Sequence, residues 1–397
     1  MLPEGWKETT LGKCVKIYSG YAPQIVDPKD DGTYPYVKVD DLNNCDKYQK
    51  NSKQYFFDEK YCIPLMSVIF PKRGAAIMNN KVRIAATHIG LDTNMMAVYP
   101  ISSVCHTEFI YYFIKYSGLY RIADISSIPQ INNKHILPYK INLPPLSEQK
   151  KIAAILSTWD KAISTADAML ENSHQQKKAL MQQLLTGKRR LPGFSGEWEL
   201  VKLKKIGTTY AGLTGKSKED FGQGTLFIPY LNVFKNSFVD NTNFEKVIIY
   251  DNEKQNCVKY GDILFTISSE TPHEVGMSSV FLDHIENVYL NSFCFGFRMK
   301  NFSILLPQYA RFLFRGNKFR GNIASLAQGA TRYNLSKTQF LEIAVLLPPL
   351  DEQRAIAAVL DAADREIALL EQKAARLREE KKALMQQLLT GKRRVRV

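Results

Sequence analysis

The sequence KKALMQQLLTGKRR occurs twice in this chain of 397 residues, from Lys177 to Arg190 and again from Lys381 to Arg394. The match extends back without a gap to a Leu-Pro-Pro-Leu segment that opens each copy, at 143 and at 347. The offset is constant, because 347 − 143 = 204. A long match at a fixed offset indicates a repeated structural unit. The chain is therefore predicted to consist of two similar halves.

Similarity resumes after each copy at a different offset, because Trp6 corresponds to Trp198 and 198 − 6 = 192. The difference, 204 − 192 = 12, places about a dozen extra residues in the second globular segment. The repeat also closes on itself. Arg190 leads directly into the second globular segment, and Arg394 is its counterpart at the end of the second copy. If the two halves have the same structure, Arg394 should lie beside the start of the first globular segment, so the two ends of the chain should lie close together.

Apolar residues recur at steps of four and three through both copies, which is the spacing of a coiled-coil seam. Ser147 or Asp351 stands at the expected N-cap, and Gly187 or Gly391 follows the last apolar residue. We predict two helices of about 40 residues, each about 60 Å long at 1.5 Å per residue. The predicted seam and partner-binding residues are Ile152, Leu156, Trp159, Ile163, Leu170, Leu180 and Leu184, and in the second copy Ile356, Leu360, Ile367, Leu370, Leu377, Leu384 and Leu388.

A helix of this length is marginal alone in water, so the two helices should pair to cover their apolar stripes. We expect an antiparallel coiled coil with pseudo-two-fold symmetry, because a parallel pair would need a long return connection for which no residues are left. One seam position is charged in both copies, as Lys177 and Lys381. Either these lysines fix the register of the pair, or they lie outside the packed zone and are solvated.

The segments outside the helices mix short β-like runs with turn residues and a later helical stretch. The β-like runs include 36–39, 67–70 and 262–266, and the helical stretches are 108–120 and 307–319. The predicted fold class is therefore α+β, with two similar domains and two long helices. The predicted boundaries are 1–145 and 191–349 for the domains, and 146–190 and 350–397 for the helices.

The chain carries 53 Lys and Arg against 39 Asp and Glu, a formal net charge of +14, which favours a polyanion such as nucleic acid. A membrane surface is the weaker alternative, because there is no apolar run of about 20 residues and no signal-like start. We expect a cytoplasmic protein without membrane contact. The six cysteines are too widely spaced for paired metal ligands or a compact disulfide framework.

Basic side chains mixed with asparagine and tyrosine mark the candidate DNA contacts, because cations bind phosphates and amides read base edges. The candidates in the first domain are Lys72, Arg73, Asn79, Asn80, Lys81 and Arg83. Those in the second domain are Lys216, Lys218, Arg332, Tyr333 and Asn334. Another basic and aromatic cluster lies at 47–55. For every one of these residues the alternative is an ordinary solvated side chain.

The sequence contains no constellation that predicts catalysis. Residues 213–217 resemble a phosphate-binding loop, but Tyr210 stands where its first glycine belongs. Glu148 and Lys150 have a nuclease-like spacing, yet they lie in the first turn of a predicted helix, where an acidic residue favours the helix dipole. The six histidines are near no cluster of Cys or carboxylates. We predict a non-catalytic chain with no cofactor and no metal of its own.

Three features together resemble the specificity subunit of type I restriction-modification systems. They are the paired Leu-Pro-Pro-Leu starts, the long helices that end in Leu-Leu-Thr-Gly-Lys-Arg-Arg, and the loop GATRYNLS at 329–336. The resemblance covers the whole chain and implies two target-recognition domains, each reading one half of a bipartite, asymmetric site in double-stranded DNA. It implies that the helices act as a spacer and dock two methyltransferase subunits. It further implies restriction and translocase subunits, with S-adenosylmethionine, ATP and Mg used by these partners.

The first domain departs from the family pattern, because it lacks the Gly-Ala-Thr-Arg element. The segments 71–74 and 266–269 also differ from each other, at a place where members of the family often carry an arginine and glycines.

Two other classes of function stay open at this point. A protein-assembly scaffold would use the helices and domains to bind proteins, and its positive charge would be incidental. The hypothesis of a nucleotide-dependent DNA-processing enzyme rests on the incomplete phosphate loop. Different loops on a repeated frame favour the specificity subunit, because two modules that read different ligands would show this pattern.

Overall fold

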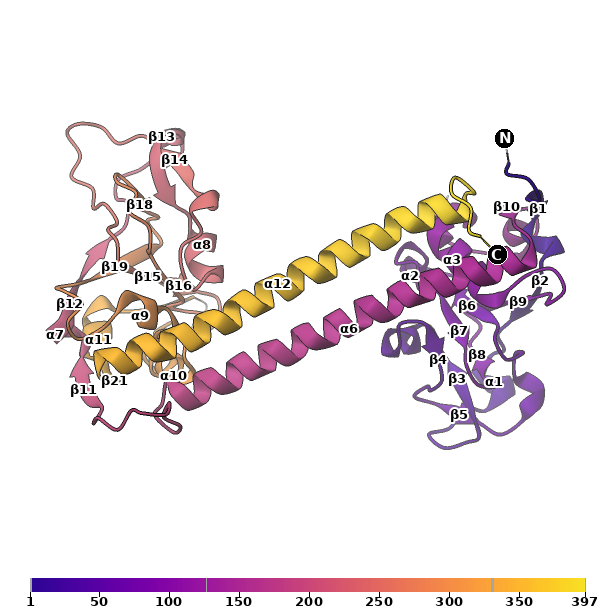
Figure 1. The fold of residues 1–397 in the computed structure, drawn as a ribbon, viewed down its shortest axis with the longest axis horizontal. Coiled ribbons are helices and arrows are strands. Elements are labelled where there is room, and N and C mark those ends of the chain that lie inside the picture. The colour runs from indigo at the N-terminus through magenta and orange to yellow at the C-terminus, as the bar shows by residue number, and fades with distance from the viewer. Residues whose placement is uncertain (1, 126, 330–331, 397) are drawn as a thin grey trace. The chain divides into compact units, whose positions relative to one another are not determined.

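The computed structural model describes residues 2–125, 127–329 and 332–396 (Figure 1). The chain divides into two units, Met1–Asp167 with Gln372–Val397, and Ala168–Glu371. Each unit holds one globular domain and one half of each long helix. These helices are α6, Leu146–Leu184, and α12, Leu350–Leu389, so both predicted long helices are present.

Both long helices begin directly after their Pro-Pro pair, one residue earlier than the predicted N-caps. Ser147 and Asp351 therefore lie inside the first turn, and their assignment as N-caps is wrong. The prediction for the other end is confirmed. Gly187 and Gly391 have φ angles of 71° and 75° just beyond the helices, a conformation that glycine adopts without a steric cost from a Cβ.

The domain of the first unit contains a five-stranded sheet of order β2-β9-β6-β7-β4 and a three-stranded sheet of order β5-β3-β8. A third, two-stranded sheet pairs β1 with β10, the strand that leads into α6. The strands are β1 Lys7–Thr10, β2 Val15–Ser19, β3 Tyr34–Val37, β4 Tyr48–Gln49, β5 Tyr55–Phe56, β6 Val68–Pro71, β7 Arg83–Ala85, β8 Gly90–Leu91, β9 Met95–Pro100 and β10 Lys140–Leu143. The short helices are α1 Pro23–Val26, α2 Ala75–Met78, α3 Thr107–Ser117, α4 Leu119–Ile122 and α5 Asn133–Ile136.

The domain of the second unit contains a four-stranded sheet of order β12-β19-β15-β17 and a three-stranded sheet of order β14-β13-β18. Two further pairs are β11 with β21 and β16 with β20. The strands are β11 Glu199–Lys202, β12 Gly207–Ala211, β13 Phe221–Ile228, β14 Glu245–Val247, β15 Ile263–Thr266, β16 Ser268–Ser269, β17 Ser278–Val280, β18 Tyr289–Leu290, β19 Cys294–Met299, β20 Tyr333–Asn334 and β21 Ala344–Leu347. The short helices are α7 Leu203–Ile206, α8 Tyr230–Lys235, α9 Pro307–Leu313, α10 Asn317–Leu326 and α11 Lys337–Glu342.

The two domains share their strand order and pairing directions. β2, β9 and β6 are neighbours in one domain, as β12, β19 and β15 are in the other. Each three-stranded sheet contains one parallel pair, β3 with β8 and β13 with β18. In both domains the first strand pairs with the strand that precedes a long helix, so that Lys7 lies opposite Leu143 and Glu199 opposite Leu347. The predicted α+β fold with two similar domains is confirmed.

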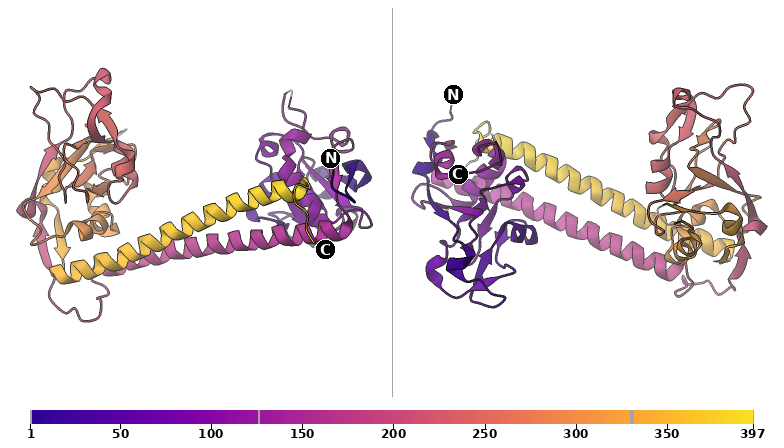
Figure 2. Two further views of the ribbon diagram at one scale, coloured as in Figure 1. Left: turned by 45° about the horizontal axis from the view of Figure 1, so that its top comes forward. Right: turned by 180° about the vertical axis from the view of Figure 1, so that it is seen from behind.

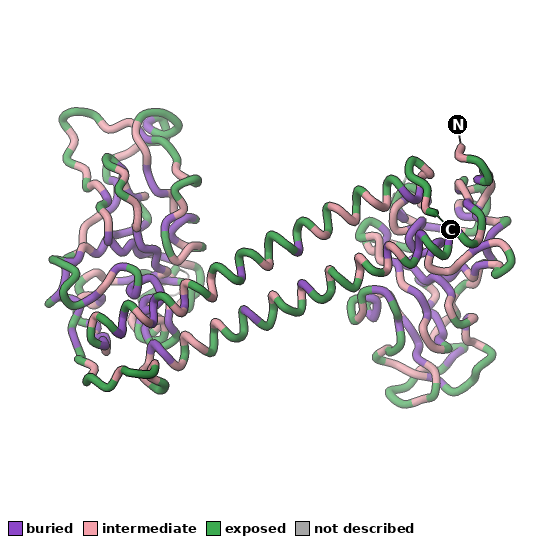
Figure 3. The backbone as a smooth tube through the Cα atoms, in the orientation of Figure 1, coloured by how far each residue is buried: buried purple, intermediate pink, exposed green. Residues whose placement is uncertain are grey.

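Buried segments gather inside each domain, whereas the long helices alternate between buried and exposed residues (Figure 3). Ile152, Leu156 and Leu388 join the core of the first domain. Leu184 joins the core of the second, together with Ile356 and Leu360 from α12. The apolar stripe of each helix is therefore shared between the domain core and the other helix. The remaining predicted seam residues are buried at Ile367 and half-buried at Trp159, Ile163, Leu170, Leu180, Leu370, Leu377 and Leu384.

Within the first unit, the start of α6 lies beside the end of α12 (Figures 1 and 2). Asp160 pairs with Lys381, and about two turns further along α6 Asp167 pairs with Arg378 at 2.5 Å. The residue numbers rise along one helix and fall along the other, so the two segments are antiparallel. The second unit shows the same direction, because Ser173 donates to Glu366 at 3.3 Å and Lys177, further along α6, pairs with Asp364. A continuous coiled coil of the two whole helices stays a prediction.

The two charged seam positions are ion-paired. Lys381 binds Asp160, and Lys177 binds Asp364 in the other unit. Adding the offset of 204 to Asp160 and Lys177 gives Asp364 and Lys381, so the repeat forms the same ion pair twice. The lysine side chains are only 23% and 13% exposed for Lys177 and Lys381, respectively. The alternative in which they are solvated is wrong, and their pairing supports a role in helix register.

The two ends of the chain meet at a buried carboxylate in the first unit. Glu148 is 1% exposed and accepts hydrogen bonds from Trp6 Nε1 at 3.1 Å and from Arg394 Nε at 2.8 Å. Arg394 also donates to the backbone oxygen of Glu4 at 2.9 Å. The expected proximity of the chain ends is therefore confirmed. In the second unit, Glu352 accepts hydrogen bonds from Trp198 and Arg190 in the same arrangement. The carboxylate of Glu148 therefore has a structural role rather than a nuclease-like one.

Candidate nucleic-acid interface

In each domain, the loop after a central strand lies against a second loop about 60 residues later in the sequence. In the first domain, Lys72 follows β6, and its backbone oxygen accepts from Ile131 at 2.8 Å. In the second domain, Ile267 follows β15, and its backbone oxygen accepts from Leu335 at 2.9 Å. Equivalent backbone bonds therefore hold equivalent loops together, although the side chains in these loops differ. We call this place the loop junction of each domain.

The loop junction of the first domain carries part of the predicted basic stretch. Arg73 and Asn79 are exposed, and Lys81 is half-buried. Lys72 is half-buried, and burial, followed by repulsion from Arg73, lowers the pKa of its ammonium group. These four side chains have no structural role in the described part of the chain that would prevent a contact with DNA.

Two predicted residues of the same stretch are held by internal hydrogen bonds. Asn80 donates to the backbone oxygen of Lys115 at 2.9 Å and accepts from the backbone of Leu119 at 3.0 Å, so it joins α2 to the corner between α3 and α4. Arg83 donates to the backbone oxygens of Cys45 and Leu42, both at 2.6 Å. These bonds favour a structural role for Asn80 and Arg83.

In the second domain, the structure brings Arg332, Tyr333 and Asn334 to the loop junction. Tyr333 lies opposite Ser269 in the β16–β20 pair, while Arg332 and Asn334 are exposed. Ala330 and Thr331 of the predicted loop lie outside the described residues.

The other two candidates of the second domain occupy a different place. Lys216 is ion-paired with Glu253 at 2.5 Å, its side chain is 3% exposed, and it lies over the ring of Tyr250. Lys218 is exposed in the following turn. Lys216 is thus part of the packing of its loop, whereas Lys218 forms no ion pair with any residue that the structure describes.

The basic and aromatic cluster at 47–55 also includes a structural residue. Lys47 is buried, ion-paired with Glu108 at 3.2 Å, and donates to Tyr112 at 3.0 Å and to Ser157 of α6 at 3.2 Å. Burial lowers the pKa of Lys47 despite the nearby carboxylate. Lys47 therefore links the first domain to its long helix.

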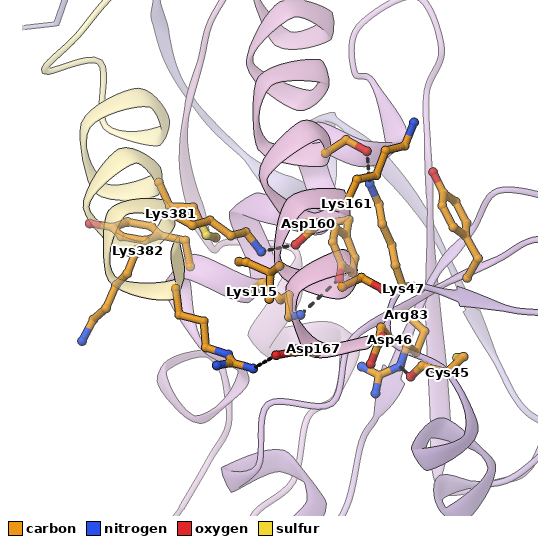
Figure 4. Close-up of a pocket in the computed structure, with 18 of the residues that line it drawn as sticks. Cys45, Asp46, Lys47, Arg83, Lys115, Asp160, Lys161, Asp167, Lys381 and Lys382 are labelled. Atoms are coloured by element: carbon orange, nitrogen blue, oxygen red, sulfur yellow. Dashed lines mark hydrogen bonds and ion pairs between the residues drawn. The ribbon is translucent and has the colours of Figure 1, made fainter. Parts of the chain in front are cut away.

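Sequence reasoning missed a cavity of about 1110 Å³ in the first unit, between α3, α6 and α12 (Figure 4). We call it the cationic pocket. Its lining includes eight cationic side chains and three carboxylates, namely Lys47, Arg83, Lys115, Arg121, Lys161, Arg378, Lys381 and Lys382 with Asp46, Asp160 and Asp167. No local signal marks it, because helical spacing alone does not say which polar residues face a neighbouring element.

Comparison with known proteins decides the family. The family described as "Type I restriction modification DNA specificity domain" matches residues 3–171 and 195–379. This chain belongs to that family. The match covers both domains and falls into two parts, as the internal repeat requires.

Two relatives with the same family description are similar in sequence to this chain. The type I restriction enzyme MjaVIII specificity subunit of Methanocaldococcus jannaschii is 26% identical over 99% of this chain and 94% of its own length. The putative MjaX specificity subunit of the same organism is 28% identical over 69% of this chain and 63% of its own length. The chain is thus a type I restriction-modification specificity subunit by family, with the non-catalytic, DNA-recognising role that this family has.

Solved structures show the same fold. The S subunit of a type I restriction-modification system from M. genitalium has a TM-score of 0.56 at 15% identity, over 97% of this chain and 96% of that one. A chain from a structure described as the basis of complex assembly and conformational transition of the type I R-M system has a TM-score of 0.63 at 17% identity, over 98% and 99%. The HsdS subunit from Thermoanaerobacter tengcongensis has a TM-score of 0.53 at 18% identity, over 98% of each chain.

The described residues of this specificity subunit contain neither a candidate membrane span nor a candidate metal site. No helix there is both long and apolar enough to cross a membrane. No group of three or more His, Cys, Asp or Glu residues is arranged there to hold a metal ion.

Proposed function

We propose that the chain is the sequence-reading subunit of a type I restriction-modification complex, in which each domain reads one half of a bipartite, asymmetric site in double-stranded DNA. The observation that carries this proposal is the loop junction. The same backbone bonds hold it in both domains, at Lys72 with Ile131 and at Ile267 with Leu335, while the exposed side chains around it differ. A common frame with different side chains suits two modules that read different base sequences.

The cationic and amide side chains at the loop junctions have the chemistry that the proposal needs. In the first domain, Arg73 and Lys81 can bind phosphates and Asn79 can pair with base edges. In the second domain, Arg332 and Asn334 offer the same two kinds of contact. Arginine is suited to guanine and asparagine to adenine in the major groove.

The part of the chain that is identical in both copies, 177–190 and 381–394, begins in the last turns of each long helix and continues just past its end. Because identical surfaces bind identical partners, we propose that each copy docks one methyltransferase subunit and that the helices separate the two half-sites. S-adenosylmethionine, ATP and Mg then belong to the methyltransferase and restriction subunits, and the DNA-reading chain needs none of them. The expected compartment of such a complex is the cytoplasm, where the DNA is.

Selection of DNA from a random pool tests this proposal. The chain, purified together with its methyltransferase subunit, should enrich one split sequence over random DNA. Specific binding typically exceeds non-specific binding by at least about 1000-fold. Enrichment of no sequence, with the complex intact, would instead indicate a protein-assembly scaffold.

A further inference from the structure

The cationic pocket of the first unit has more positive charge than its carboxylates neutralise. Two of its three carboxylates are already paired, Asp160 with Lys381 and Asp167 with Arg378. Among the described residues, no carboxylate lies within ion-pairing distance of Lys115, Lys161 or Lys382. Arg83 and Arg121 have no ion pair among the described residues either, so these three ammonium groups and two guanidinium groups carry the unbalanced charge of the pocket.

Lys115 is the most informative of the three, because it is partly buried. It extends from α3, and its ammonium group donates to the neutral hydroxyl of Tyr111 at 3.2 Å. Lys381 of α12 and Asp160 of α6 point into the same space (Figure 4). A half-buried ammonium group without a carboxylate is costly unless an anion balances it.

The repeat provides an internal comparison for this pocket. A smaller cavity of about 230 Å³ in the second unit is lined by residues at the equivalent helix positions, including Lys177 and Lys178. There the domain contributes Arg315, which donates to the backbone oxygens of Ser278 at 2.7 Å and Val233 at 3.0 Å. The arginine is therefore used to hold its own domain together. The same helix sequence therefore lines a large cationic pocket in one unit and a smaller cavity in the other.

We propose that the cationic pocket binds a phosphate group of the DNA backbone and so gives the first unit a sequence-independent anchor on DNA. This inference rests on the proposed function. The pocket is connected to the candidate interface, because Asn80 bonds the backbone at Lys115 and at Leu119, next to the exposed Tyr120 and Arg121 of the rim. Tyrosines beside cations suit a nucleic acid, whose sugars and bases pack on rings while its phosphates bind ammonium groups.

The repeat also supplies a matched control. Lys382→Gln removes an exposed cation of the cationic pocket, and Lys178→Gln makes the same change in the same local helix sequence of the second unit. Duplexes with and without the target sequence should bind the Lys382→Gln complex about 3- to 10-fold more weakly. The slope of log affinity against log salt should fall by about 1, as expected for one lost phosphate contact. Lys178→Gln should leave the salt slope nearly unchanged, and any loss of affinity that comes from weaker methyltransferase docking should be equal in the two variants.

Lys115 gives the pocket a pH signature. Burial and repulsion from Lys381 and Arg83 lower the pKa of Lys115 to about 8, against the attraction of Asp160 and Asp46. Tyr111 is the other group that faces it. A bound phosphate favours the charged ammonium, so DNA affinity should fall as the pH rises from 7 to 9. Lys115→Arg should bind DNA with a weaker pH dependence over this range, because arginine stays charged.

The outcomes separate this inference from the proposed function. If Lys382→Gln and Lys115→Met complexes remain folded and keep the wild-type affinity and salt slope, the pocket is not a phosphate site, even when sequence preference is intact. Loss of the methyltransferase subunit from these variants at an unchanged salt slope would assign the pocket to an acidic protein surface and also overturn the inference. Absence of any sequence preference in the wild-type complex would overturn the proposed function itself.

Discussion

We expect an insertion in α6 alone to lower the free energy of unfolding by at least about 3 kcal/mol. The inserted segment is a second copy of residues 161–167, placed after Asp167. The start of α6 is tied to the first domain by β10, so the shift falls on its second half. There Lys177 and Lys178 would take the places of Leu184 and Leu185, which are 1% and 6% exposed in the core of the second unit. Each buried leucine contributes about 1.5–3 kcal/mol, and a buried ammonium group adds a further cost.

The matched control inserts residues 365–371 a second time after Glu371 as well, so that both helices gain seven residues. Each unit then keeps its own pairs, Asp160 with Lys381 and Lys177 with Asp364, because seven residues are close to two full turns. Urea unfolding followed by circular dichroism should show a large loss of stability for the single insertion and a small one for the double insertion. Equal losses in both variants would contradict the antiparallel pairing within the units.

The double insertion also has a functional consequence under the proposed function. Seven helical residues add about 10.5 Å of helix, and a base pair adds about 3.4 Å of DNA length. The gap between the half-sites should therefore grow by about three base pairs while the bases read on each side stay the same.

Replacing Arg332, Tyr333 and Asn334 together by alanine should abolish the reading of one half-site and leave the other intact. Each lost base contact costs about 1–3 kcal/mol, so three such changes should weaken binding to the full target by about 100-fold or more. The backbone pairing of Tyr333 with Ser269 does not depend on the side chain, so the domain should stay folded. Binding to duplexes with scrambled half-sites, measured one half at a time, checks this result.

The reciprocal variant, Arg73→Ala with Asn79→Ala, serves as the control in the first domain. It should affect only the other half-site. If both variants weaken discrimination at the same half-site, or at both half-sites equally, the assignment of one half-site to each domain is wrong. Thermal unfolding of each variant verifies that the domains are intact.

The repeat made the long helices predictable from the sequence, because a seam of apolar residues and a terminal glycine are local signals. The N-caps were assigned wrongly, because the helices begin directly after Pro-Pro, at Leu146 and Leu350, and Ser147 and Asp351 lie inside the first turn. Whether Lys177 and Lys381 are packed between the helices or solvated could not be decided from the sequence. Their carboxylate partners lie on the other helix about 200 residues away, and no local pattern connects them.

The candidate site was predicted less well than the fold. Composition drew attention to 72–83, but it could not separate Arg73, which is exposed, from Arg83, which bonds backbone oxygens of its own domain. The same limit applies to Lys216, because its ion pair with Glu253 forms only in the folded loop. Lys115 lies in the predicted helical stretch 108–120 but was not among the candidate residues, because the three elements around it come together only in the folded chain.

The central claim is that two domains on a repeated frame read two different half-sites. Its most direct test is a map of methylated positions in the DNA of cells that make this chain together with its methyltransferase subunit. The account predicts a single split motif, with two different half-sites separated by a fixed number of unread base pairs. An uninterrupted palindrome would contradict it.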